Sequence, residues 1–176
     1  MTPCAPVPPR DLPDRTAELL VELRAVYHDA DGLYAGWSCP ASTECCRFGI
    51  TGREPYVTSI ELLAVKKAIA ARGGARSWKR APPVGDDPNG RATGRTALPV
   101  VSEERTCPLL DPEGRCSVYE ARPLGCRTFF CDRADAGGKV KQREVNALVR
   151  RIQVIAERHE VGGERGRPLV KALARE

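Results

Sequence analysis

The sequence contains no long run of apolar residues, and no stretch approaches the roughly 20 residues that a membrane-spanning helix needs. The opening segment, MTPCAPVPPRDLPDR, also lacks the apolar centre of a secretory signal. We therefore expect no membrane segment and a cytoplasmic location, where thiols stay reduced and stable disulfides are rare. The 176-residue chain nevertheless has eight cysteines, although a domain of this size does not need disulfides for stability. Metal binding is the first explanation to test.

Motifs of independent catalysis are missing as well. The chain has no P-loop, dinucleotide-binding glycine motif, nucleophile elbow or HExxH pattern. Its two histidines, His28 and His159, belong to no recognisable motif. Because nucleophilic cysteine catalysis needs a nearby base, a thiol-redox or cysteine-nucleophile enzyme is the weakest of three hypotheses. The sequence leaves open whether the protein is an enzyme at all.

The chain also has little excess of charge of either sign. It carries 28 basic and 23 acidic residues, for a net charge of +5. Basic residues are mostly spread among acidic ones, whereas nucleic-acid-binding proteins usually gather them on one face. These features argue against a nucleic-acid partner. The segment RGGARSWKR (72–80) is the densest basic stretch, and we interpret it as a solvated linker rather than a contact patch.

Apolar residues at helical spacing predict three helices that pack on one another. The first begins at Asp14 and ends near Asp31-Gly32, and the second opens with a capping-box pattern at Thr58 and Glu61. The third covers residues 141–160. The expected apolar stripes are Leu19, Leu20, Leu23, Val26 and Tyr27 in the first helix, Leu62, Leu63, Val65 and Ile69 in the second, and Val145, Leu148, Val149, Ile152, Ile155 and Ala156 in the third.

The predicted fold is mainly α, with irregular loops and a small β-hairpin, in one small domain organised around a cysteine metal centre. Residues 1–13 are predicted to be a flexible proline-rich arm, and residues 14–161 form the domain. Within it, residues 73–98 are expected to be a long loop or insertion, followed by a short strand at 97–101. Residues 162–176 form a C-terminal segment with a last helical turn from Pro168.

Seven of the eight cysteines fall into two clusters. The first cluster is CPASTECCR, and the second lies between residues 107 and 131. A predicted helix separates them, so the fold must bring them together if they share a site. Cys4, in the proline-rich arm, is interpreted as a bystander. The candidate metal ligands are Cys39, Cys45, Cys46, Cys107, Cys116, Cys126 and Cys131.

The second cluster contains Asp-Pro-Glu-Gly at residues 111–114, a favourable type I turn sequence. A hairpin closed by this turn would pair Leu110 with Arg115. Cys107 and Cys116 would then be diagonal neighbours on one face, about 7–8 Å apart. That separation is too large for a disulfide but suits two ligands of one metal centre.

Beyond this hairpin, residues 118–122 predict a single helical turn ended by a proline. Gly125 then predicts a backbone bend that points Cys126 toward the hairpin. Arg47 and Arg127 each directly follow a cysteine. Because a cation beside a thiol favours the thiolate, we interpret both arginines as residues next to a bound cofactor.

The spacing of the cysteines favours a polynuclear centre. Zinc sites commonly contain Cys-x-x-Cys or paired histidines, and neither they nor common ferredoxin spacings occur here. Cys45 and Cys46 are adjacent, and neighbouring side chains diverge in extended chain. Seven thiols also exceed the four that a tetrahedral ion takes. An iron–sulfur cluster, or two ions sharing bridging thiolates, would account for both facts.

The two clusters resemble the YkgJ-type cysteine-cluster family, described as a zinc- or iron-chelating domain with a CxxCxxCC motif. The residues that carry the resemblance are Cys39, Cys45, Cys46 and Arg47, then Cys107-Pro108-Leu109-Leu110, Cys116 with Val118-Tyr119-Glu120, Arg122-Pro123, and Cys126-Arg127. The resemblance extends over residues 36–135 and implies metal binding, without implying a reaction.

One position departs from the family pattern. The second cysteine of the CxxCxxCC run falls at Ser42, and serine is a poor ligand for a soft metal. Cys131 lies where the family usually has no cysteine. Our hypothesis is that Cys131 replaces the ligand lost at Ser42.

The preferred functional hypothesis is a protein that holds an iron–sulfur or related iron cluster and acts in electron transfer, metal handling or support of a partner enzyme. The alternative is a structural zinc module for protein or nucleic-acid interaction. In that alternative, Arg76, Lys79 and Arg80 would be the first surface to test. The sequence does not indicate an oligomeric state.

Overall fold

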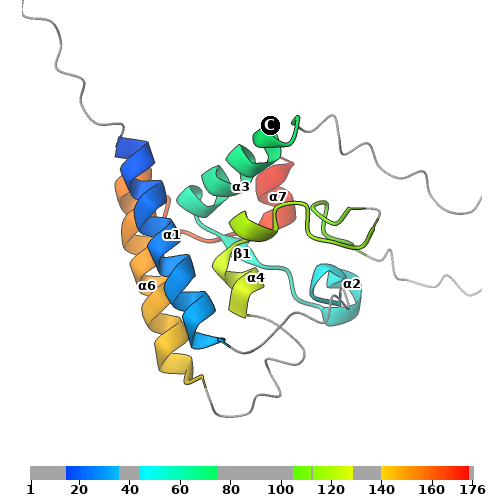
Figure 1. The fold of residues 1–176 in the computed structure, drawn as a ribbon, viewed down its shortest axis with the longest axis horizontal. Coiled ribbons are helices and arrows are strands. Elements are labelled where there is room, and N and C mark those ends of the chain that lie inside the picture. The colour runs from blue at the N-terminus through cyan, green and yellow to red at the C-terminus, as the bar shows by residue number, and fades with distance from the viewer. Residues whose placement is uncertain (1–14, 36–43, 75–104, 112, 129–139, 175–176) are drawn as a thin grey trace, which may run out of the picture.

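The computed structural model describes residues 15–35, 44–74, 105–111, 113–128 and 140–174. The predicted arm, the strand at 97–101, the basic residues 75–80, Cys39 and Cys131 lie outside this part of the chain. The described residues are mainly helical and include a two-stranded antiparallel pair (Figure 1), which confirms the predicted fold class. None of the helices within these ranges is both long and apolar enough to cross a bilayer.

Two long helices, α1 (Arg15–Leu33) and α6 (Gln142–His159), lie side by side and antiparallel (Figure 1). Ion pairs join facing turns of the two helices, at 2.6 Å between Glu22 and Arg158 and at 2.7 Å between Asp29 and Arg151. Both helices bury most of the stripes predicted from the sequence, but Val145 is only partly buried and Val149 is 39% exposed. The helical core is the buried set Leu19, Leu20, Leu23, Val26, Tyr27, Ala30, Ile60, Leu124, Leu148, Ile152, Ile155 and Ala156.

Helix α3 (Ser59–Ala71) packs across this pair and begins at the predicted capping box. The backbone N–H of Thr58 donates to Glu61 Oε2 at 2.9 Å. The Ser59 N–H donates to the carbonyl of Gly163, also at 2.9 Å, and so ties the start of α3 to the chain that follows α6. After the last turn of α3, Gly73 and Gly74 adopt positive φ angles of 98° and 77°, which ends the helix.

The strand pair joins residues that are far apart in the sequence. Strand β1 (Tyr56–Val57) pairs antiparallel with β2 (Arg167–Pro168), and β2 leads into the predicted last helical turn, α7 (Leu169–Leu173). These elements close a second apolar cluster, which we call the cysteine-side core. It consists of Phe48, Val57, Leu62, Val65, Cys107, Leu109, Val118, Leu169 and Ala172.

Candidate metal centre

Five of the seven candidate ligands lie in the described part of the chain, on three short segments. Cys45 and Cys46 occupy the 3-10 turn η1 (Glu44–Cys46), just before helix α2 (Phe48–Thr51). Cys107 and Cys116 lie in the irregular segment that follows residue 105. Cys126 lies in helix α4 (Leu124–Thr128). All five are free cysteines, and Cys107 is buried while the other four are half-buried.

Backbone pairing lays the first cysteine cluster against the second. Arg47 and Thr106 form an antiparallel bridge. Beside this bridge, the N–H of Cys107 donates to the carbonyl of Cys46 at 2.7 Å. The fold therefore brings together two clusters that a whole helix separates in the sequence, as the hypothesis of a shared site requires.

The predicted hairpin register is wrong by one residue. The predicted turn closes, with the Gly114 N–H donating to the Asp111 carbonyl at 3.0 Å, but Gly114 has a φ of 75° and acts as a bulge. Leu110 therefore pairs with Cys116 instead of Arg115. Cys107 precedes the paired residues and accepts a hydrogen bond from the Leu110 N–H, so it is not the diagonal neighbour of Cys116. Its partner is Cys46.

The adjacent cysteines do not diverge as they would in extended chain. The tight turn of η1 places the sulfur atoms of Cys45 and Cys46 3.8 Å apart. A tetrahedral ion with metal–sulfur bonds of about 2.3 Å separates its ligand sulfurs by about 3.8 Å. The two sulfurs can therefore bind the same metal ion. The prediction that neighbouring cysteines would diverge too far to share one ion was wrong.

Interactions among the thiols raise their pKa values. A hydrogen bond with the Cys107 thiol, together with burial, raises the pKa of Cys46 to about 12. Burial raises the pKa of Cys126, and the thiols of Cys116 and Cys46 raise it further. These raised pKa values favour the protonated thiols of Cys46 and Cys126. A thiophilic metal ion would replace these protons, because a coordinating thiol is deprotonated.

Arg122 is the cation whose charge acts on these thiols. A hydrogen bond with Cys46 is the main cause of the raised pKa of Cys45, burial is the main cause at Cys116, and the positive charge of Arg122 opposes both increases. Its guanidinium lies 3.8 Å from the centre of the Tyr119 ring, and its side chain is buried. In the sequence, Arg122 is marked only by the Arg-Pro step that precedes Cys126, and that step was the available signal.

Comparison with known proteins agrees with this geometry. A family profile described as "CxxCxxCC: Putative zinc- or iron-chelating domain" matches residues 38–147, which is more than half of the chain. The chain belongs to the CxxCxxCC family. This membership confirms the resemblance inferred from the sequence and supports binding of zinc or iron. No curated protein and no solved structure matches the chain.

The two arginines that follow cysteines have different surroundings in this CxxCxxCC domain. Arg47 is exposed at the start of α2. Arg127 is 4% exposed and forms a 2.6 Å ion pair with Asp31. It also donates to the carbonyls of Arg122 and Glu120, and lies 4.3 Å from the centre of the Tyr27 ring. The contacts of Arg127 thus fix α4 against α1.

Glu61 positions the same helix from the other side. Its carboxylate closes the capping box of α3 and also accepts the N–H of Leu124, the first residue of α4, at 2.9 Å. Gly125 does not bend the chain as predicted, because it lies inside α4. A side chain there would begin 3.2 Å from the Cβ of Pro55, so glycine permits close packing. Cys126 is therefore held by a helix that is anchored at both ends.

Neither histidine of this CxxCxxCC protein forms a hydrogen bond or an ion pair with any of the described cysteines. His28 is 91% exposed beside Asp29, and His159 contacts the hydroxyl of Ser59 at 3.0 Å. Among the residues that the structure describes, no three His, Cys, Asp or Glu side chains converge closely enough to hold one ion. Thiols suit a soft metal ion. Their direct contacts here are pairwise, between Cys45 and Cys46 and between Cys46 and Cys107.

Proposed function

We propose that the protein holds an iron–sulfur or related iron cluster on the thiolates of Cys39, Cys45, Cys46, Cys107, Cys116, Cys126 and Cys131. In this proposal it acts in electron transfer, metal handling or support of a partner enzyme, in the reducing cytoplasm. The observation that supports it most is the gathering of five thiols from three segments in a site without a histidine donor. Cys131 supplies the thiol that Ser42 lacks.

The number and pairing of the thiols favour a centre with more than one metal atom. One pair is Cys45 with Cys46, and another is Cys46 with Cys107. Cys116 and Cys126 lie near enough to influence the same thiols electrostatically. A cluster several ångströms across uses ligands that are spread in this way, whereas one tetrahedral ion takes four thiols at most.

The residues around the thiols have separate roles in this proposal. When bound, an iron–sulfur cluster would supply a site for transfer of single electrons. Arg122 stabilises negative charge on Cys45 and Cys116, and Arg127 and Glu61 hold the helix that carries Cys126. Arg47, at the exposed end of the first cluster, is proposed to lie next to the bound group.

A structural zinc module is the second candidate function. It is favoured by the 3.8 Å separation of the Cys45 and Cys46 sulfurs, which equals the ligand spacing of a tetrahedral zinc–thiolate site. In that case the protein would bind another protein or a nucleic acid. Reversing the charge of Arg76, Lys79 and Arg80 would then abolish partner retention.

Anaerobic purification followed by iron, zinc and acid-labile sulfide analysis, with a visible spectrum, tests the proposal. We expect iron with sulfide and absorption in the visible range. Cys46→Ser and Cys126→Ser should each lose most of the bound iron, whereas Cys4→Ser, in the N-terminal arm, should retain it. A colourless protein that is stable in air and retains zinc would overturn the iron proposal and favour the second candidate.

A further inference from the structure

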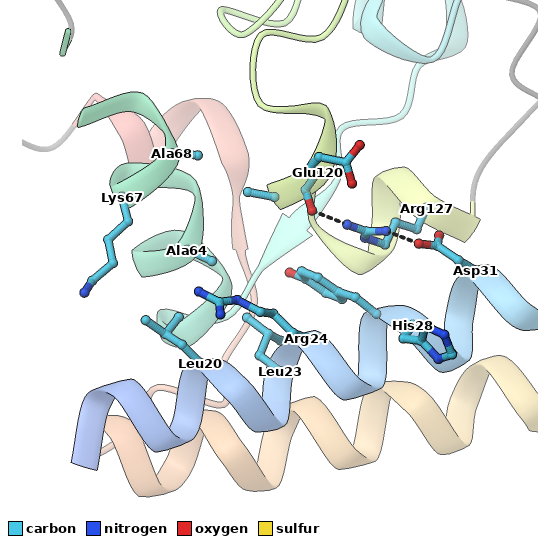
Figure 2. A pocket seen from close by; sticks show the side chains of 12 residues that line it. Leu20, Leu23, Arg24, His28, Asp31, Ala64, Lys67, Ala68, Glu120 and Arg127 are labelled. Atoms are coloured by element: carbon cyan, nitrogen blue, oxygen red, sulfur yellow. Dashed lines mark hydrogen bonds and ion pairs between the residues drawn. The ribbon is translucent and has the colours of Figure 1, made fainter. Parts of the chain in front are cut away.

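A separate cavity of about 510 Å³ opens between α1, α3 and the segment around α4 (Figure 2). Its floor is formed by the buried side chains of Leu20, Leu23 and Tyr27 on α1. Pockets that bind small molecules have volumes of roughly 300–1,000 Å³ and a mostly apolar lining with a few polar groups. The volume of this cavity lies within that range, and its lining combines the apolar floor with six charged or titratable side chains.

Small side chains create the hollow. Helix α3 presents Ala64 and Ala68, one turn apart, to the cavity, and Ala121 lines it from the neighbouring segment. Each is only partly buried, although larger apolar residues surround it. A leucine at either position on α3 would project into the space and reduce it. The cavity therefore depends on alanine at positions 64 and 68, although helix α3 could form with larger side chains there.

The charges of the cavity are separated toward its two ends. Arg24 of α1 and Lys67 of α3 lie toward one end, and Asp31, Glu120 and Arg127 toward the other (Figure 2). At the second end, Arg127 is already neutralised by its ion pair with Asp31. Within the described residues, neither Arg24 nor Lys67 forms a hydrogen bond or an ion pair with another side chain.

We propose that this cavity binds a small organic acid that has an apolar body and a single carboxylate. The apolar body lies on the floor formed by Leu20 and Leu23, and the carboxylate lies between Arg24 and Lys67. Burial of the apolar part supplies affinity, and the two cations select an anion over a neutral molecule of the same shape. None of the candidate metal ligands is among the residues that line this cavity.

The test is isothermal titration calorimetry of the protein as purified, with three probes of equal chain length. These are octanoate, octan-1-ol and octylammonium. We expect octanoate to bind at least tenfold more tightly than octan-1-ol, and octylammonium to bind more weakly than either. Absence of octanoate binding, or equal affinities for octanoate and octan-1-ol, would overturn the proposal.

Substitution of the two exposed cations tests whether their charge, rather than the fold, determines the affinity for octanoate. The double variant Arg24→Gln/Lys67→Gln should reduce octanoate affinity at least tenfold, to the level of octan-1-ol. Arg150→Gln, an exposed arginine on α6 away from the cavity, is the matched control and should leave the affinity unchanged. Equal losses in the two variants would contradict the assigned position of the carboxylate.

Filling the cavity tests its location. Ala64→Leu and Ala68→Leu should each reduce the affinity for octanoate and octan-1-ol alike, because both probes use the same floor. Ala70→Leu, at an exposed position of the same helix, controls for the effect of leucine on α3. Circular dichroism establishes that each variant is folded. Unchanged binding in folded Ala64→Leu and Ala68→Leu proteins would place the ligand elsewhere and reject this cavity.

Discussion

Glu61 links two of the helices that surround the candidate metal centre, α3 and α4. Its carboxylate is 3% exposed and accepts three hydrogen bonds of 2.9 Å, from the Thr58 N–H, the Thr58 hydroxyl and the Leu124 N–H. Glu61→Ala leaves two buried N–H groups without an acceptor, and each such group costs about 1–3 kcal/mol. We therefore expect the free energy of unfolding to fall by about 3 kcal/mol, measured by chemical denaturation.

Glu144 provides a matched control for this substitution. It occupies the same capping position in α6, where its carboxylate accepts the exposed Lys141 N–H at 2.9 Å and, among the described residues, has no donor comparable to Leu124. Loss of an exposed helix cap costs about 1 kcal/mol. If Glu144→Ala is as destabilising as Glu61→Ala, then the link from Glu61 to α4 contributes nothing beyond the capping box.

At the scale of elements, Gly163 determines how α3 meets α6. A Cβ at this position would lie 2.5 Å from the carbonyl oxygen of Ala156 and 2.8 Å from that of Glu160, and would also overlap the hydroxyl of Ser59. Two of these obstacles are backbone atoms, which cannot rotate away. Gly163→Ala should therefore lower the free energy of unfolding by about 1–3 kcal/mol, as overpacking usually does, with a lower melting temperature in calorimetry.

Gly32 is the control for this prediction. It lies near the end of α1, and nothing lies within 4 Å of a Cβ built there. Gly32→Ala should stabilise the protein by up to about 1 kcal/mol, because alanine favours the helix. The prediction is contradicted if Gly163→Ala raises the free energy of unfolding, because α3 and α6 could then move apart without destabilising the protein.

The elements differ in how far the sequence predicted them. The helices were predicted well, because stripes such as Leu148, Ile152 and Ile155 follow the helical period and both ends carry signals. The register after Leu110 was missed because a glycine bulge adds one residue that the turn sequence alone does not reveal. The pairing of β1 with β2 joins residues more than a hundred positions apart, and two-residue strands have no periodicity to detect.

For the molecule as a whole, the candidate ligands were predictable and their arrangement was not. Cysteine counts and the family resemblance identified the thiols directly. The contact of Cys46 with Cys107 depends on a bridge between Arg47 and Thr106, which no local pattern indicates. The role of Arg122 likewise appears only in the folded chain, because one of the two thiols on which its charge acts, Cys45, lies on a segment far from it in the sequence.

The division into two apolar clusters predicts how the molecule responds to metal removal. The helical core contains no cysteine, whereas the cysteine-side core includes Cys107 and packs against Cys46 and Cys116. Chelation under reducing conditions should therefore loosen residues 44–57 and 105–121 and leave α1 and α6 folded. Hydrogen–deuterium exchange measured by mass spectrometry should show lost protection in the first two segments only. Equal loss in α1 and α6 would mean that the metal supports the whole domain, and no loss anywhere would mean that the centre has no structural role.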